Sequence, residues 1–163
     1  ARIIFRNIVR RRDGESWNSL WEVFQKEKDE YTKEDILASL GNTGDKEVLL
    51  TYLDYILHSE LIKPQDMLMC LVSISNTMTG VDLLWKWLRE NWDELSTKLE
   101  KGSVIHLAVI GSCIGSLCTE EHLKQLNSFF ADKDEVFESV VANSKEKVKF
   151  KSKIAKFERN KIP

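Results

Sequence analysis

Proline and glycine are scarce in this chain, with two Pro and seven Gly among 163 residues. This scarcity leaves long uninterrupted segments and favours helices over a turn-rich β architecture. No apolar run approaches the roughly 20 residues that a transmembrane helix requires. The first residue is Ala, not Met, and a helical pattern begins at once. We therefore expect the chain to be a piece of a longer protein.

Sequence motifs of catalysis are absent as well. The chain contains no H-E-x-x-H, no G-x-S-x-G, no P-loop and no Rossmann glycine fingerprint. Its three histidines, His58, His106 and His122, lack the spacing with Cys or carboxylates that a zinc ligand set shows. We expect no catalytic residue, no metal ligand and no cofactor site in these 163 residues.

Cysteine is rare and odd in number. Cys70, Cys113 and Cys118 lie in apolar helical runs, where buried free thiols are the usual case. A disulfide between Cys113 and Cys118 would require a break in the helix between them. The chain also has no N-x-S/T glycosylation sequon. Both observations favour a reducing compartment.

Charge is unevenly distributed, although the formal net charge is only −2. Residues 1–12 carry five Arg and no acid, and residues 145–163 carry eight basic residues and two acids, so the central part is strongly acidic. A basic end can mark a nucleic-acid or anionic-membrane partner. Here the lysines lie at helical spacing opposite or beside Val148, Ile154 and Phe157, as on the solvated face of a terminal helix. We expect no nucleic-acid partner and no membrane contact.

Apolar residues recur at helical spacing along almost the whole chain, and no segment alternates as a β-strand would. Capping residues divide this pattern into about eight to ten helices of about 10–15 residues each. The expected boundaries are N-caps at Ser16, at Thr32 (with Asp35 in a capping box), at Asp45 and at Thr119, a stop at Gly41–Gly44, one helix over Val81–Leu95, and a last long helix from about Asp134 toward Asn160.

Helices of this length cannot bury their apolar faces alone, so we expect antiparallel helical hairpins to stack into a superhelix. The units show no tight period of the tetratricopeptide or ankyrin kind. This predicts one irregular all-α superhelix of HEAT or armadillo type over residues 1–163. A bundle of three or four helices is disfavoured because the helices are too many and too short.

The five tryptophans stand at helical spacing. Such residues more often form contacts between repeats than a platform for carbohydrate or peptide. Trp85 and Trp92 lie seven residues apart, on one side of the helical pattern, and are expected to hold neighbouring hairpins together. Trp87 points elsewhere and is expected to be partly exposed.

Six segments of the chain together carry a resemblance to a known family: Trp17–Trp21 (WNSLW), Ala38–Asp45 (ASLGNTGD), Leu49–Leu53 (LLTYL), Ile62–Asp66 (IKPQD), Gly80–Trp92 (GVDLLWKWLRENW) and Thr119–Phe130. In this order they resemble the C-terminal domain of the aminopeptidase N-like zinc aminopeptidases, the gluzincin family that includes the puromycin-sensitive and endoplasmic-reticulum aminopeptidases. Their order and spacing follow the family from about residue 2 to 130. The tail departs from it, because Phe150 and Phe157 replace a tryptophan that is usual there.

The resemblance implies a non-catalytic role. In that family the zinc site lies in an upstream catalytic domain, and the C-terminal domain forms a bowl of HEAT-like hairpins that caps the active site and limits peptide access. Implied partners are the upstream catalytic domain, the peptide substrates and, in some members, a second copy. The 163 residues would be the C-terminal part of the larger C-terminal domain and would hydrolyse nothing alone. The parent would hold zinc.

Residues that would serve this role are harder to assign from the sequence. Candidates for contacts in the substrate chamber or at an interface are His106, Gln65 and Trp87. His106 has the only ionisable nitrogen in the uncharged segment 102–119. For each of the three, a purely structural packing role is the alternative interpretation. An alternative function is a HEAT-like scaffold for protein partners, from a family member without the zinc motif. The cytoplasm is the favoured location. An extracellular or membrane-anchored ectodomain of the parent stays open.

Overall fold

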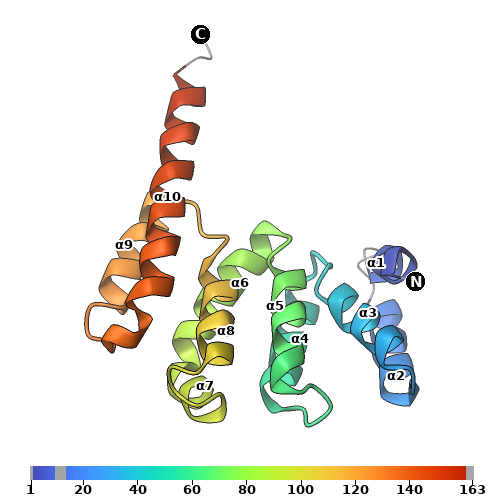
Figure 1. Ribbon diagram of the computed structural model, residues 1–163. Helices are drawn as coiled ribbons and strands as arrows, with labels where there is room; N and C mark the ends of the chain where they lie inside the picture. Colours follow the sequence, from blue (N-terminus) through green and yellow to red (C-terminus); the bar gives the residue numbers. More distant parts are fainter. Residues whose placement is uncertain (1, 10–13, 161–163) are drawn as a thin grey trace.

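Helices account for most of residues 2–9 and 14–160, the residues that a computed structural model describes (Figure 1). This part of the chain contains no β-strand, which confirms the all-α expectation, and none of its helices could cross a membrane. The elements are α1 (Arg2–Val9), α2 (Gly14–Lys26), α3 (Glu30–Leu40), α4 (Lys46–His58), α5 (Met67–Ile74), α6 (Met78–Glu90), α7 (Trp92–Lys98), α8 (Val104–Ile114), α9 (Glu120–Phe129) and α10 (Glu138–Arg159), with 3-10 turns η1 (Pro64–Asp66) and η2 (Glu135–Phe137).

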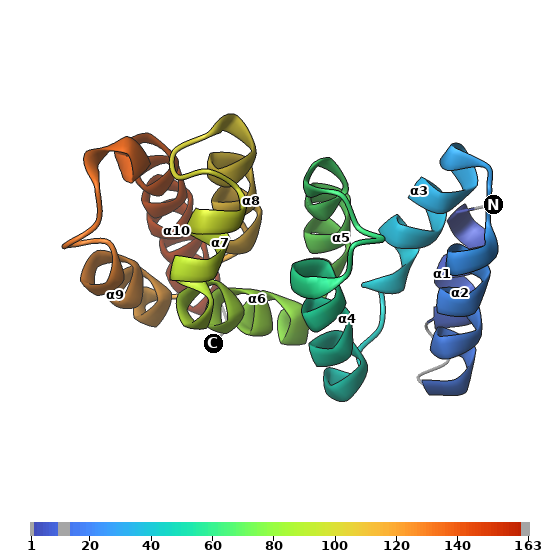
Figure 2. The same ribbon diagram turned by 90° about the horizontal axis from the view of Figure 1, so that it is seen from below.

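The helices form two layers along an array (Figures 1 and 2). We call α3, α5, α8 and α10 the front layer, because they face the viewer in Figure 1. Each of them contacts the next, and α1 packs on α3 at one end. The rear layer contains α2, α4, α6 and α9, which pack on the front layer as antiparallel partners. The architecture is the irregular HEAT-like superhelix that the sequence predicts.

Aromatic side chains join successive helices of the rear layer. Trp21 of α2 stacks on Tyr55 of α4 with ring centroids 4.7 Å apart. Trp85 of α6 meets Phe129 of α9 edge to face at 5.6 Å, and its indole N–H donates to Gln125 Oε1 at 2.7 Å. These geometries are the favourable ones for aromatic pairs. The prediction that Trp85 holds neighbouring hairpins together is confirmed.

The C-terminal end of α3 is buried where α2, α4 and α5 meet. The last four carbonyls of a helix have no partner within it, and here side chains supply one. Trp17 Nε1 donates to the Leu40 carbonyl at 3.0 Å, Tyr52 Oη to the Leu37 carbonyl at 2.7 Å, and Asn42 Nδ2 to the Ala38 carbonyl at 3.0 Å. Three of the segments that carry the family resemblance therefore converge on one buried polar network.

Gly41 ends α3 for a reason other than the expected glycine stop. Its φ of −80° lies in the ordinary right-handed region, so no left-handed cap is formed. A Cβ at this position would instead lie 2.1 Å from Ser73 Oγ and 2.6 Å from the Ile74 amide nitrogen of α5. Glycine is required here because the end of α3 approaches α5 so closely.

Two expected N-caps are wrong. Helix α2 begins at Gly14, two residues before Ser16. Helix α3 is capped by Asp29, whose carboxylate accepts the Thr32 N–H at 2.8 Å, so Thr32 lies in the first turn. An Asp carboxylate is at least as good an acceptor as a Thr hydroxyl at this position, and the helix extends to it.

The other expected caps are confirmed, and one expected helix is divided. Asp45 caps α4 through the amides of Glu47 and Val48, and Thr119 caps α9 in a capping box with His122. The predicted helix over Val81–Leu95 is interrupted at Asn91, which separates α6 from α7. The Asn91 side chain donates to the Trp87 carbonyl at 2.9 Å, which satisfies a carbonyl at the end of α6.

Candidate interaction surface

Two neighbouring helices of the front layer, α5 and α8, carry no charged residue. The uncharged segments run over residues 67–81 and 102–119. On α5, Val72 is 52% exposed, and Leu68 and Met69 are half-buried. On α8, Leu107 and Ala108 are half-buried. We call the accessible side chains of these two helices the uncharged face.

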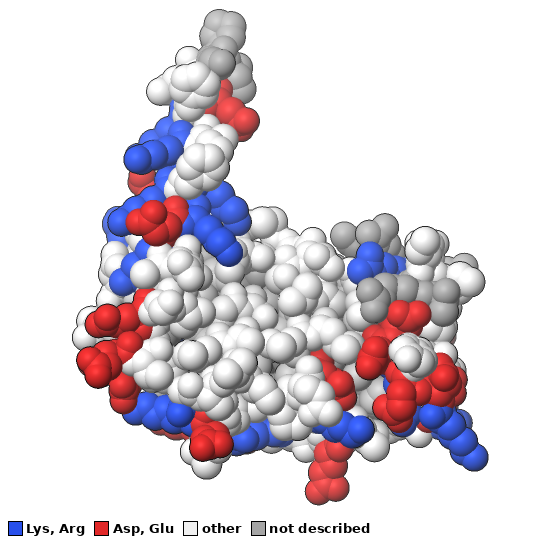
Figure 3. Space-filling view, in the orientation of Figure 1, with Lys and Arg blue, Asp and Glu red and all other residues white. Residues whose placement is uncertain are grey.

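Figure 3 shows the uncharged face from the front. Lys, Arg, Asp and Glu gather around its edges, over α9 and α10 on one side and near α2 and α3 on the other, while the area over α5 and α8 is free of them. Contiguous surfaces of this kind, rimmed by charge, mark sites of interaction. The surface fits an uncharged or apolar partner, because a charged group would be desolvated there without a counter-ion.

His106 lies on α8 but is fully buried. Its ring contacts Trp92 and Phe137 with centroids 5.8 and 5.4 Å away. The Gly102 N–H donates to Nδ1 at 3.1 Å, so the ring proton belongs on Nε2. Burial, and after it the charge of Lys101, lowers the pKa of His106. The neutral imidazole thus fixes the turn between α7 and α8 and presents no surface.

The other two candidate residues do not join His106. Trp87 of α6 is only 7% exposed, so the expected partial exposure is not observed. Helix α6 is covered on several sides, by α4, α5, α7 and α8, and little of it reaches solvent. Gln65 lies exposed in η1, at the start of α5. Of the three candidates, only Gln65 has an accessible side chain.

The remaining histidines have structural partners. His58 of α4 lies 2.9 Å from Asp54 and 3.2 Å from Glu94 of α7. His122 accepts the Thr119 N–H and lies 3.2 Å from Asp82 of α6. Over residues 2–9 and 14–160, no group of His, Cys, Asp and Glu is arranged to hold a metal ion. The described residues therefore do not fit a zinc site.

A groove of about 380 Å³ lies between α1 and α2, lined mainly by the apolar residues Phe5, Ile8, Leu20 and Val23. The neighbouring Ile3 and Ile4 are 76% and 64% exposed. The groove lies at the opposite end of the array from α10 (Figure 1). It is a second apolar surface, separate from the uncharged face.

The sequence pointed to one half of the uncharged face and missed the other. The lack of charge over 102–119 directed attention to the correct helix, α8. The residue that it singled out there, His106, faces the core and does not belong to the uncharged face. The α5 side chains Leu68 and Val72 resemble core residues in the sequence. Their side of the helix could be found only by noting that 67–81 also lacks charge and that α5 and α8 are neighbours in the fold.

The fold and this surface define a class: an all-α helical array that offers a broad uncharged face. The chain matches the ERAP1-like C-terminal domain family over residues 1–150 and belongs to that family. This confirms the resemblance to the C-terminal domain of aminopeptidases.

Three similar proteins are each much longer than the chain. It is similar to aminopeptidase N of Homo sapiens (28% identical over 132 residues, 81% of this chain and 14% of that protein). It is also similar to endoplasmic reticulum aminopeptidase 1 of Mus musculus (32% over 117 residues, 72% and 13%) and to the alanine/arginine aminopeptidase of Saccharomyces cerevisiae (25% over 131 residues, 80% and 15%). The chain thus spans less than one sixth of each of these relatives.

Proposed function

We propose that the chain is the non-catalytic C-terminal part of a zinc-dependent aminopeptidase, and that it forms a wall of the helical bowl that caps the active site and limits peptide access. The observation that carries the proposal is the uncharged face of α5 and α8, in a domain that belongs to an aminopeptidase family. Peptides of many sequences can pass an uncharged wall: their apolar side chains can contact it, and their charged side chains, which stay in water, are neither attracted nor repelled by it.

Chemistry is assigned to another part of the parent. Zinc would polarise the scissile carbonyl and activate water there, at ligands that the catalytic domain would supply. The partners of this chain are then the upstream catalytic domain and the peptides that enter between the two. A second copy of the parent is a further partner in this proposal.

Charge on the face provides the test. In the parent enzyme, Val72→Lys should change kcat/KM for long peptides in a manner that depends on peptide charge, with basic peptides cleaved more slowly. A single-residue aminoacyl substrate should be cleaved as before. Leu50→Lys is the matched control, because Leu50 is 41% exposed on α4 of the rear layer. Equal kinetics of all three proteins on peptides of every charge would refute the chamber role.

A further experiment separates this proposal from a scaffold that binds protein partners. The purified 163-residue chain should release no amino acid from aminoacyl fluorogenic substrates, while the parent should bind zinc and cleave them. Hydrolysis by the chain itself, at a rate unchanged through successive purification steps, would contradict its non-catalytic assignment. A parent without zinc and without activity would leave the scaffold as the function.

A further inference from the structure

The C-terminal half of α10 projects beyond the rest of the array (Figure 1). The first half packs on α8 and α9 through Val141, Ser144 and Val148, which are buried. From Lys149 onward, all side chains of α10 except half-buried Ser152 are exposed. The match to the family ends at residue 150, so α10 from residue 151 onward lies outside the segment that the family model covers.

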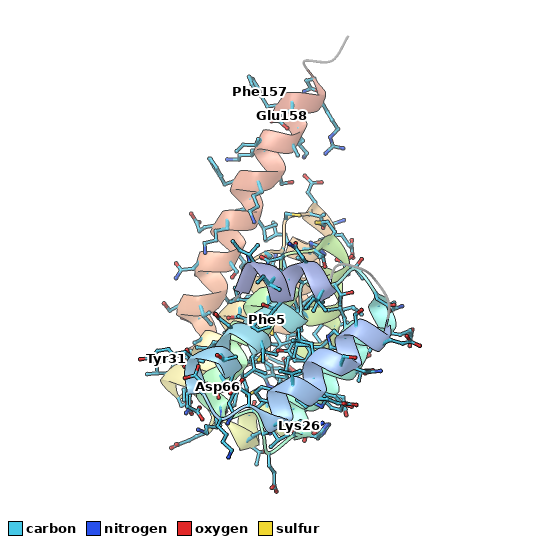
Figure 4. The ribbon with its side chains drawn as sticks, turned by 90° about the vertical axis from the view of Figure 1, so that its right-hand side faces the viewer. Phe5, Lys26, Tyr31, Asp66, Phe157 and Glu158 are labelled. Carbon is cyan, nitrogen blue, oxygen red and sulfur yellow. The ribbon has the colours of Figure 1, made fainter. Side chains whose placement is uncertain are left out.

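An apolar stripe runs along the projecting half. Phe150, Ile154 and Phe157 are 65%, 42% and 61% exposed, and their spacing of four and three residues places them on one side of the helix. Phe150 follows Val148 by two residues, about 200° around the helix axis. The stripe therefore points away from the buried side of α10. Figure 4 shows Phe157 near the free end of the helix, beyond the other helices.

Lysines flank the stripe on both sides. With about 100° per residue, Lys149 and Lys153 lie along one edge and Lys147 and Lys151 along the other. Figure 3 shows basic side chains on both sides of the projecting helix. Lys156 is paired with Glu120 of α9, and residues 145–159 hold only two acids against seven basic residues. The projecting half is therefore a basic amphipathic helix whose apolar side faces outward.

The charge and size of the stripe indicate whether it binds a second copy of the chain or a lipid surface. A second copy of α10 would bring two basic flanks together, and like charges at that distance repel. Three side chains also cover far less than the roughly 800 Å² per partner of a stable protein interface. A lipid surface needs no such area, because shallow insertion of aromatic residues and attraction of lysines to anionic headgroups add together.

We propose that the projecting half of α10 docks on an anionic lipid bilayer. Phe150, Ile154 and Phe157 enter the boundary between headgroups and acyl chains, and the flanking lysines contact lipid phosphates and carboxylates. The helix lies on the membrane and does not span it. This departs from the expectation of no membrane contact, because Ile154 and Phe157 do not share the buried side of Val148.

Co-sedimentation with vesicles tests the proposal. The chain should bind phosphatidylcholine vesicles that contain phosphatidylserine and should not bind vesicles of phosphatidylcholine alone. Phe150→Gln with Ile154→Gln should lower the partition coefficient about tenfold or more, since buried apolar area is lost. Lys149→Gln with Lys153→Gln should lower it about 25-fold, from about fivefold for each lysine. Gln is a good helix former, so the helix is retained.

Two control variants change exposed residues away from α10. Tyr31→Gln on α3 removes an aromatic residue that is 82% exposed, and Lys46→Gln removes an exposed lysine of α4; both should bind as the unmodified chain does. Circular dichroism should show equal helix content in all variants. Three results would overturn the proposal: no binding to anionic vesicles, binding that the apolar double variant retains in full, or a dimer that this variant abolishes in the absence of lipid binding.

Discussion

Removal of one hydroxyl group, in Tyr52→Phe, should destabilise the domain by about 1–3 kcal/mol, the cost of an unsatisfied buried acceptor. Tyr52 is fully buried, and its hydroxyl donates to the Leu37 carbonyl in the last turn of α3. Burial also raises the pKa of Tyr52 well above its usual value. Because the side chain is enclosed, bulk solvent does not reach the Leu37 carbonyl to replace the lost hydrogen bond.

Urea unfolding, followed by circular dichroism, measures the effect as a difference in the free energy of unfolding at constant m-value. For a chain of this size, each kcal/mol should also lower the Tm by about 2–4 °C. Tyr31→Phe is the control, because Tyr31 is 82% exposed and loss of an exposed hydroxyl should change stability by less than about 0.5 kcal/mol.

The reasoning would be refuted by a Tyr52→Phe variant as stable as Tyr31→Phe. Such a result would mean that the Leu37 carbonyl finds water or another donor, and that the end of α3 is less tightly enclosed than its contacts with α2 and α5 indicate. If Tyr52→Phe and Trp17→Phe each lower the free energy of unfolding by an intermediate amount, the result would point to coupling between the two residues within the buried polar network at the end of α3. A double-mutant cycle would quantify this coupling.

Three further predictions concern packing and titration. Gly41→Ala should cost more than about 2 kcal/mol in urea unfolding because its Cβ would meet α5 backbone, whereas Gly14→Ala, with open space around it, should not destabilise; equal effects would contradict the close approach. Burial raises the pKa of Cys70 to about 12 and that of Cys113 further, so the folded state keeps these protons at a pH where the unfolded state has lost them. The free energy of unfolding should therefore be unaffected below about pH 9 and should fall above it by up to about 1.4 kcal/mol per pH unit for each thiol. A free energy of unfolding that stays constant up to about pH 11 would count against the burial of these thiols. Of the three cysteines, only Cys118 is half-buried, and Cys70 and Cys113 are buried. Ellman's reagent should therefore modify Cys118 rapidly and the other two thiols only after unfolding. Rapid reaction of all three thiols would show that Cys70 and Cys113 are not buried.

Local patterns carried much of the fold. Helical spacing of apolar residues, with Asp45 and Thr119 at N-caps, was sufficient to predict an all-α array, because a cap and a helix period depend on residues only three or four positions apart. The errors at Ser16 and Thr32 are local as well: α2 begins two residues before Ser16, and Asp29 takes the cap position of α3 that was expected for Thr32. Asn91 divided a helix that periodicity alone presents as continuous.

The candidate site was less accessible from the sequence. The spacing of Trp87 and the isolation of His106 among uncharged residues drew attention to both, yet both are buried. Each lies on a helix packed on several sides, and the sequence of one helix does not state how many neighbours cover it. The uncharged face needed two distant segments, one of which contains Val72, to be brought side by side.

By itself, the sequence determined the class of fold, the absence of catalytic motifs and the family, because these depend on composition, short-range spacing and the order of motifs. Tertiary structure decided which side of each helix is used. In the folded chain His106 is buried in the core, and Trp17 and Tyr52 both bind the C-terminal end of α3. Phe150 and Ile154 face outward. The physical reason is that the rotation of a helix about its own axis is fixed by the sum of contacts with its neighbours, and those contacts join residues far apart in the chain.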